Sequence, residues 1–190
     1  AGAVKHFTQH LGERHGVQHV IKPHAAVRHL VGRRIEGVRV HEHRLRFAVN
    51  TRKLRRISAG AVRGVRRRAK YLLLRFAHGT LLVHLGMSGR LMLGDRSAPE
   101  LDHTHLVLSL DDSRELRLVD PRRFGLAVWL EPGDEARDPS LSALGLEPLD
   151  PGLEQVLPPL LRTRRSPLKS LILDQHLGAG VGNIYAAEAL

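Results

Sequence analysis

The stretch YLLLRFAHGTLLVHLG, residues 71–86, decides the fold. Two strongly apolar runs, residues 71–76 and 80–86, are separated by His78 and Gly79, which suit a turn. Short apolar runs joined by such a turn predict a β-hairpin with one buried face.

The segments around this hairpin extend the β pattern. Apolar or alternating residues predict further strands at 33–47, 105–110, 114–119 and 125–130. A turn at residues 111–113 would join the middle two into a second hairpin. We therefore expect residues 31–130 to form an antiparallel β-sandwich or a flattened barrel.

The strand pattern ends after residue 130. Residues 131–152 are rich in proline, glycine and acidic side chains, and predict a linker with one short helix. Helical segments follow at 153–161, 167–176 and 184–190, and Asn183 is well placed to cap the last one. The expected fold class is α+β: an N-terminal antiparallel β-sandwich lobe followed by a helical lobe over 153–190, which we expect to be incomplete because no stop signal precedes Leu190.

Residues 1–30 differ from the rest of the chain. They hold six of the thirteen histidines and a single carboxylate, Glu13, and they sustain neither a helical nor a strand period. We interpret the histidines as compositional, because a metal site needs ligand spacing that this segment lacks. We expect the segment to be disordered or foreign to the fold.

The charge of the chain is strongly asymmetric. Residues 1–98 hold 21 Lys and Arg against 4 Asp and Glu, whereas residues 99–190 hold 9 against 15. Most of the cations are arginines, which suit bidentate phosphate contacts. A basic half of this strength indicates a polyanionic partner, nucleic acid foremost, with an anionic membrane surface or a merely solvated face as alternatives.

Two absences from the sequence narrow the class of protein. The chain has no cysteine, which excludes disulfides and thiolate metal sites and indicates a reducing cytoplasm. No run of about 18 apolar residues is present, so we expect no membrane span.

Four segments carry candidate chemistry, and each has a plain structural alternative. RRRAKYLLL (66–74) sets Lys70 at the rim of the sheet, where it reaches a phosphate or a reacting sugar, or is only solvated. HLGMSGRL (84–91) projects Met87 from a glycine loop, either as a wedge between base pairs or as a partly buried packing residue.

The other two segments lie further along the chain. DPRRFG (120–125) combines Phe124 as an apolar plug with arginine donors, or is a core phenylalanine beside two surface arginines. LDQHLGAGVGNIYA (173–186) joins two helices by a glycine-rich turn, whose N–H groups form an anion site or belong to an ordinary helix hairpin.

In this order and spacing, RRAKYLLL, HLGMSG, DPRRFG and GVGNIYA resemble the motifs of the formamidopyrimidine-DNA glycosylase family, which includes endonuclease VIII. The resemblance covers residues 31–190, and HLGMSG with DPRRFG favours the formamidopyrimidine branch. It implies two lobes with duplex DNA between them, and a helix–two-turn–helix element at LGAGVGN. The implied function is base-excision repair: a DNA glycosylase and abasic-site lyase for oxidised purines such as 8-oxoguanine and formamidopyrimidines.

The resemblance also implies residue roles. Met87, Arg122 and Phe124 would fill the gap left when the damaged nucleotide flips out of the helix. Lys70 would approach the lesion in a supporting catalytic role. Contacts to the DNA backbone would fall to His84, Lys169, Asn183 and Tyr185, with His103 of DHTHL as a looser match.

The start of the sequence departs from the family pattern. Family chemistry begins at an N-terminus reading approximately Pro-Glu-Leu-Pro-Glu, whose proline amine attacks the sugar while the glutamate moves protons. This chain starts Ala1-Gly2-Ala3 and has no Pro-Glu pair before Val31. We therefore expect impaired or absent catalysis, and we interpret residues 1–30 as an out-of-frame translation, since residues 22–27 match a one-nucleotide shift in a plausible coding of the family's Glu-Thr-Thr-Arg-Arg-Gly.

The remaining expectations concern partners and location. The family's zinc finger is not in these 190 residues, so we expect no zinc and no other cofactor in this chain. We expect a monomer that binds damaged double-stranded DNA in the bacterial cytoplasm, associated with the nucleoid. Two alternatives stay open: an active enzyme in which Lys5 or Lys22 replaces the missing amine, and a non-catalytic basic nucleic-acid-binding module.

Overall fold

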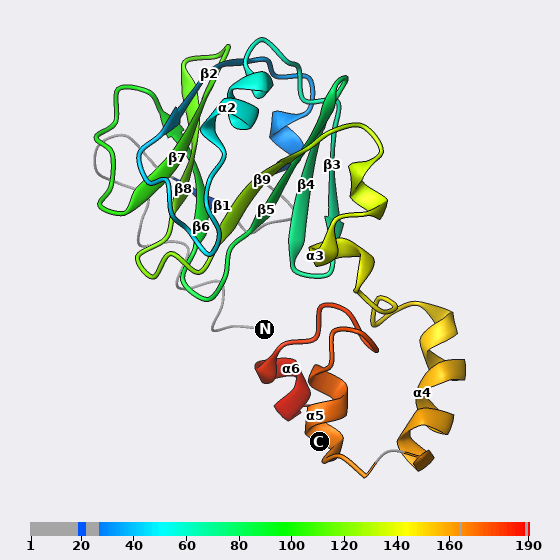
Figure 1. The fold of residues 1–190 in the computed structure, drawn as a ribbon. Coiled ribbons are helices and arrows are strands. Elements are labelled where there is room, and N and C mark those ends of the chain that lie inside the picture. Colours follow the sequence, from blue (N-terminus) through cyan, green and yellow to red (C-terminus); the bar gives the residue numbers. More distant parts are fainter. Residues whose placement is uncertain (1–18, 22–26, 164, 189) are drawn as a thin grey trace.

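A computed structural model of the chain describes residues 19–21, 27–163, 165–188 and 190. These residues form a β-rich lobe followed by a connector and a small helical lobe (Figure 1). The α+β class with an N-terminal β lobe is therefore confirmed. Among the described residues, no helix is both long enough and apolar enough to cross a lipid bilayer.

The β lobe consists of two antiparallel sheets that face each other (Figure 1). The first sheet has, in spatial order, β1 (His19–Ile21), β6 (Arg90–Asp95), β8 (Arg114–Val119), β7 (Thr104–Leu110) and β2 (Ile35–Val40). The second has β3 (Gly64–Arg68), β4 (Tyr71–Phe76), β5 (Gly79–His84) and β9 (Leu126–Leu130). We call this lobe the sandwich.

The predicted hairpin at 71–86 is β4–β5, but it is buried on both faces rather than on one. Leu72 and Leu74 belong to the main core between the sheets. Leu73 and Leu82 point the other way, into a second cluster that Leu141 of the connector covers. A strand covered on both sides needs no polar alternation, which explains the unbroken leucine run.

Several predicted boundaries differ from the structure. The segment 33–47 contains one strand, β2, and a basic stretch follows as two short helices, α2 (Thr51–Leu54) and η2 (Arg55–Ile57). Strands β1, β3 and β6 were not predicted. The sequence of β3, GVRRR, carries few apolar side chains, so it lacks the strand signal; in the structure it lies at the edge of its sheet, paired with β4.

The connector and the helical lobe follow the predicted order. The connector holds two short helical segments rather than one, η3 (Asp134–Ala136) and α3 (Pro139–Ser142). The helical lobe comprises α4 (Pro151–Thr163), α5 (Leu168–Leu173) and α6 (Asn183–Glu188). The turn between α5 and α6 carries the glycine-rich sequence, and in Figure 1 it lies on the side of the helical lobe that faces the sandwich.

Two parts of the segment 1–30 are described. Strand β1 pairs with β6, with Val20 opposite Met92, and η1 (Val27–Leu30) precedes the family motifs. These parts belong to the sandwich, whereas residues 1–18 and 22–26 lie outside the described residues. The out-of-frame origin of this segment stays a prediction.

A charged pair is buried on the outer face of the first sheet. The side chains of Glu115 and Arg117 are 0% and 1% exposed, and Arg117 Nη2 lies 2.9 Å from Glu115 Oε2. Arg117 also donates to the carbonyl oxygens of Ala98 and Pro99, which lie on the loop that covers this face. Burial opposes ionisation of Glu115, yet hydrogen bonds from Arg39 and Arg117 hold the pKa of its carboxyl below its ordinary value.

We expect Glu115→Ala to lower the free energy of unfolding by about 3–5 kcal/mol, because it leaves Arg117 buried without its counter-charge. Since the folded pKa of Glu115 is depressed, its stabilising effect is present above the unfolded pKa and is lost as pH falls through the folded value. Urea titration at neutral pH measures the loss. Glu36→Ala, which removes an exposed partner of Arg96, is the control and should cost less than about 1 kcal/mol. Equal losses in both variants would contradict the argument.

Candidate nucleic-acid interface

A cleft of about 620 Å³ lies between one end of the sandwich, the connector and the glycine-rich turn. Three basic side chains of the sandwich line it, namely Arg46, Lys70 and His84. The connector contributes the segments 139–140 and 143–144. No aspartate or glutamate is among the described residues that line the cleft, so the charged side chains of its lining, Arg46 and Lys70, are both cationic.

Lys70 reaches the cleft from the turn between β3 and β4. Its Nζ donates a hydrogen bond to the carbonyl oxygen of Val181, at 2.9 Å, and so bridges the sandwich to the helical lobe. Burial lowers the pKa of the Lys70 ammonium below its ordinary value. The predicted position at the rim of the sheet is what the structure shows.

His84 ends β5 directly opposite Tyr71 of β4, and the two ring centroids are 4.8 Å apart. The N–H of Gly86 donates to His84 Nδ1 at 3.0 Å, which leaves the other ring nitrogen to carry the proton of the neutral ring. Burial, and then the positive charges of Arg46 and Lys70, lower the pKa of His84. His84 is thus a neutral donor at the cleft surface.

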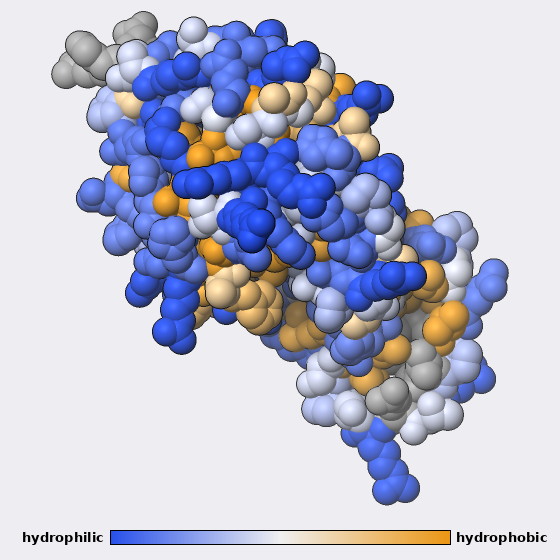
Figure 2. Space-filling view, turned by 45° about the horizontal axis from the view of Figure 1, so that its top comes forward, coloured by the Kyte–Doolittle hydropathy of each residue, from blue (hydrophilic) through white to orange (hydrophobic). Residues whose placement is uncertain are grey.

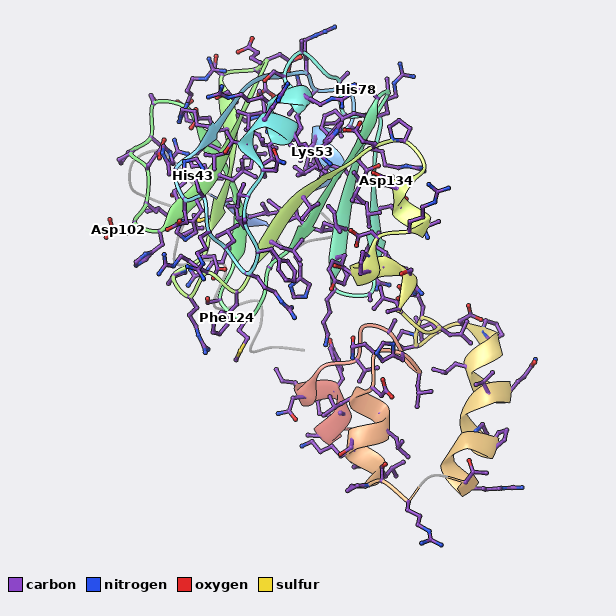
Figure 3. All side chains as sticks on the ribbon, viewed as in Figure 1. His43, Lys53, His78, Asp102, Phe124 and Asp134 are labelled. Carbon is purple, nitrogen blue, oxygen red and sulfur yellow. The ribbon has the colours of Figure 1, made fainter. Side chains whose placement is uncertain are left out.

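The two motif loops lie at the rim of the cleft. Met87 is 76% exposed and Phe124 is 44% exposed, so the alternatives of a packing methionine and a core phenylalanine do not hold. The Arg122 guanidinium lies 4.5 Å from the centre of the Phe124 ring, and its Nη1 lies 3.6 Å from Met87 Sδ. Figure 3 shows Phe124 at the end of the sandwich that faces the helical lobe.

Asp120 holds these two loops together, and sequence reasoning did not single it out. Its side chain is fully buried and accepts hydrogen bonds from Ser88 Oγ at 2.6 Å and from the Gly125 N–H at 2.7 Å. The loops also approach closely at Gly86, where an added Cβ would lie 2.6 Å from the carbonyl carbon of Phe124. Its backbone φ of +62° independently favours glycine.

The structure does not bring every predicted residue into the cleft. Lys70, His84, Met87 and Phe124 line it, and Arg122 contacts the last two. The other four, which do not line it, are Lys169 on α5, Asn183 and Tyr185 on α6, and His103 before β7. Asn183 is the first residue of α6, and His103 has a left-handed backbone, with φ of 64°, whose carbonyl accepts the Asp120 N–H.

Arg46, Gln175 and His176 are among the cleft residues that the sequence analysis does not predict. Gln175 organises the glycine-rich turn, because its amide donates to Val181 O and accepts from the Gly180 N–H, both at 2.9 Å. His176 Nδ1 donates to Ala143 O at 2.7 Å and so ties this turn to the connector. The signal is present in the sequence, since both residues lie in the motif LDQHLGAGVGN beside the glycines.

Metal binding has no visible support in the part of the chain that the structure describes. There, no group of three or more histidine, aspartate or glutamate side chains is arranged to hold an ion. The expectation of no cofactor stays a prediction.

Comparison with known proteins identifies the scaffold. The family model for the formamidopyrimidine-DNA glycosylase N-terminal domain matches residues 12–127. A formamidopyrimidine-DNA glycosylase of Acidithiobacillus ferrooxidans is 47% identical over 163 residues, covering 85% of this chain and 60% of that protein. One from Thioalkalivibrio sulfidiphilus is 46% identical over 164 residues, covering 86% and 60%.

Solved structures agree with the sequence relatives. A Lactococcus lactis formamidopyrimidine-DNA glycosylase, non-covalently bound to DNA with an AP site, superposes with a TM-score of 0.79 at 27% identity. The match covers 86% of this chain and 63% of that one. A complex of the L. lactis protein with Fapy-dG-containing DNA gives a TM-score of 0.76 at 27% identity, covering 86% and 62%.

The sandwich, its cleft and the attached helical lobe are thus the scaffold of a DNA glycosylase family. The chain belongs to the formamidopyrimidine-DNA glycosylase family. It spans about 60% of the length of the curated relatives it matches. The family match begins at residue 12, inside the segment 1–30 that the sequence analysis placed outside the family.

We expect His84 to titrate below the pH at which an unperturbed histidine does, because burial and two neighbouring cations disfavour its charged form. Arg46→Ala should raise the His84 pKa toward its ordinary value, since one of those cations is removed. NMR titration of the ring protons measures both values, with Arg44→Ala as a control that leaves the cleft intact. A His84 pKa at or above its ordinary value would refute this account.

We expect Asp120→Asn to loosen both motif loops, because the amide cannot accept two hydrogen bonds in the same geometry. The free energy of unfolding should fall by about 1–3 kcal/mol, as for a buried donor left unsatisfied. Amide hydrogen exchange at Gly125 should accelerate in Asp120→Asn. Ser88→Ala removes only the Ser88 bond and keeps the Gly125 bond, so exchange at Gly125 should be slower in Ser88→Ala than in Asp120→Asn. Unchanged Gly125 exchange in Asp120→Asn would show that the carboxylate does not hold the loop.

Proposed function

We propose that the chain binds damaged double-stranded DNA in this cleft, as the lesion-binding part of a base-excision repair glycosylase for oxidised purines such as 8-oxoguanine and formamidopyrimidines. The observation that carries the proposal is the pairing of a carboxylate-free basic cleft with two exposed apolar side chains, Met87 and Phe124, at its rim. The family membership supports the choice of DNA as the polyanion.

The rim of the cleft carries side chains that can fill the gap left in the duplex when a nucleotide flips out. Removing a base from the stack leaves a gap, and apolar side chains can replace the lost stacking. Met87 and Phe124 project from loops that Asp120 holds together, so both apolar groups are presented before DNA arrives. Arg122 lies against both of them and adds a donor for base edges or phosphates.

The cations of the cleft suit the backbone of the duplex. Arg46 and Lys70 would contact phosphates, and neutral His84 would donate a hydrogen bond rather than a charge. Lys169, Asn183, Tyr185 and His103 lie outside the cleft lining, and we propose them as contacts to flanking phosphates along the duplex. Figure 2 shows hydrophilic side chains over much of the sandwich face in that view.

We further propose that base removal is impaired in this chain. The family's reaction uses an amine nucleophile beside a carboxylate that moves protons. The described lining of the cleft offers the Lys70 amine, already bonded to Val181 O, and no carboxylate. Lys70 is accordingly assigned a supporting role. A cationic lining without a carboxylate also favours a second candidate function, a non-catalytic nucleic-acid-binding module.

The test measures the affinity of the chain for a duplex with one stable abasic-site analogue and for the undamaged duplex, by fluorescence anisotropy over a range of salt concentrations. We expect preference for the damaged duplex and affinities that fall steeply with salt. Replacing both Met87 and Phe124 by alanine should remove about tenfold of that preference, roughly the stacking of one base, while leaving undamaged-duplex binding unchanged. Leu101→Ala, an exposed apolar residue outside the cleft lining, is the matched control.

The outcomes separate the candidates. Equal affinity for both duplexes would replace the lesion-binding proposal by the general binding module. Borohydride reduction with a natural abasic site should yield no covalent adduct, whereas an intact family member yields one. An adduct mapped to Lys5, Lys22 or Lys70 would overturn the proposed impairment and reveal a substitute amine.

A further inference from the structure

Three parts of the chain meet at the turn between β3 and β4, and one carboxylate lies at their junction. Glu147, in the connector, accepts a hydrogen bond from the Ala69 N–H at Oε1, at 2.6 Å. Its Oε2 accepts from Arg67 Nη1 at 2.7 Å, and Arg68 Nη1 lies 3.3 Å from Oε1. A single side chain thus receives donors from three successive residues, the last two of β3 and the first of the turn that follows.

The connector beside Glu147 is also bonded to both lobes. On the sandwich side, Arg68 Nη2 donates to the carbonyl oxygens of Leu144 and Gly145, at 3.1 and 2.5 Å. On the helical side, Leu146 forms a parallel bridge with Gly178, and its carbonyl accepts the Ala179 N–H at 2.7 Å. Residues 144–147 therefore act as a strap between the two lobes.

The turn whose Ala69 N–H is bonded to Glu147 also carries Lys70. Ala69 has a left-handed backbone, with φ of 51°, and is 5% exposed. A Cβ added at Gly180 of the glycine-rich turn would lie 3.2 Å from Ala69 Cα, so the two turns are in close contact. Because an alanine adopts this φ at a cost, the bond from its N–H to Glu147 stabilises the conformation from which Lys70 reaches Val181.

We propose that Glu147 is a positioning residue, a latch that sets the orientation of the helical lobe on the sandwich and directs Lys70 into the cleft. It touches neither DNA nor any reacting atom in this account, and its effect on binding is transmitted through Ala69 and the strap. The binding part of the proposal rests on the DNA-binding function proposed above, whereas the orientation part does not.

Glu135 provides a matched control. Its side chain is 26% exposed, like that of Glu147, and it also has hydrogen-bonding and ionic partners, Thr80 at 2.7 Å and Arg75 at 3.7 Å. Those partners belong to the outer face of the second sheet, so the Glu135 contacts do not involve the helical lobe. Glu147→Gln retains an acceptor for the Ala69 N–H and loses the negative charge, whereas Glu147→Ala loses both.

The first measurement is the distance between spin labels on the two lobes. The chain has no cysteine, so Lys53→Cys on α2 and Glu188→Cys at the end of α6 can be labelled without other changes. Double electron–electron resonance should give a narrow distance distribution for the parent and for Glu135→Gln. It should give a broad or shifted distribution for Glu147→Ala and an intermediate one for Glu147→Gln. Circular dichroism and a retained unfolding transition establish that the sandwich is folded in each variant.

The second measurement is the affinity for the abasic-analogue duplex. Glu147→Ala should weaken binding by about tenfold, whereas Glu135→Gln should not change it. A narrow, unshifted distance distribution in both Glu147 variants would overturn the latch. A broadened distance distribution with no change in affinity would overturn only the binding part of the proposal and would support the orientation part. If the parent does not bind DNA, the proposed function is contradicted. The distance distributions would then still test the role of Glu147 in orienting the two lobes.

Discussion

The two-sided burial of the β4–β5 hairpin is the constraint on which the rest of the structure depends. Leucines on one face of the hairpin need the opposing sheet, and leucines on the other face need a different cover. The connector supplies that cover through α3, and by doing so it is held against the sandwich. The position of α3 therefore sets where the chain leaves the sandwich for the helical lobe. The cleft lies at the end of the hairpin that carries Tyr71 and His84.

The polar groups of the cleft follow from this arrangement. Tyr71 and His84 occupy the last paired position of the hairpin, on the same outer face as the covered leucines. Beyond them the chain turns, and the turns carry Lys70 on one side and Met87 on the other. The site is therefore built at the boundary between an apolar layer and solvent, where basic groups can be partly desolvated without losing access to a ligand.

Much of this could be predicted from the sequence, because apolar runs and glycine motifs are local signals. The hairpins, the α+β class and the rim residues Met87 and Phe124 came from such patterns. Asp120, Arg46 and Glu147 could not be found in that way, because their roles arise from partners far along the chain. Likewise, the alternation of β8 marks Leu116 and Leu118 as core residues, but it gives no sign that Glu115 and Arg117 are buried on the opposite face. The loop after β6 folds over the ionic pair, and the Ala98 carbonyl of that loop accepts a hydrogen bond from Arg117.

Strand β1 has a consequence for how the molecule behaves among its own copies. It is three residues long and lies at the end of the first sheet, where its backbone occupies the hydrogen-bonding edge of β6. An uncovered β6 edge would be a template for strands of neighbouring molecules. Because β1 is only three residues long and stands at the edge of its sheet, the backbone that this edge presents to strands of neighbouring molecules is short.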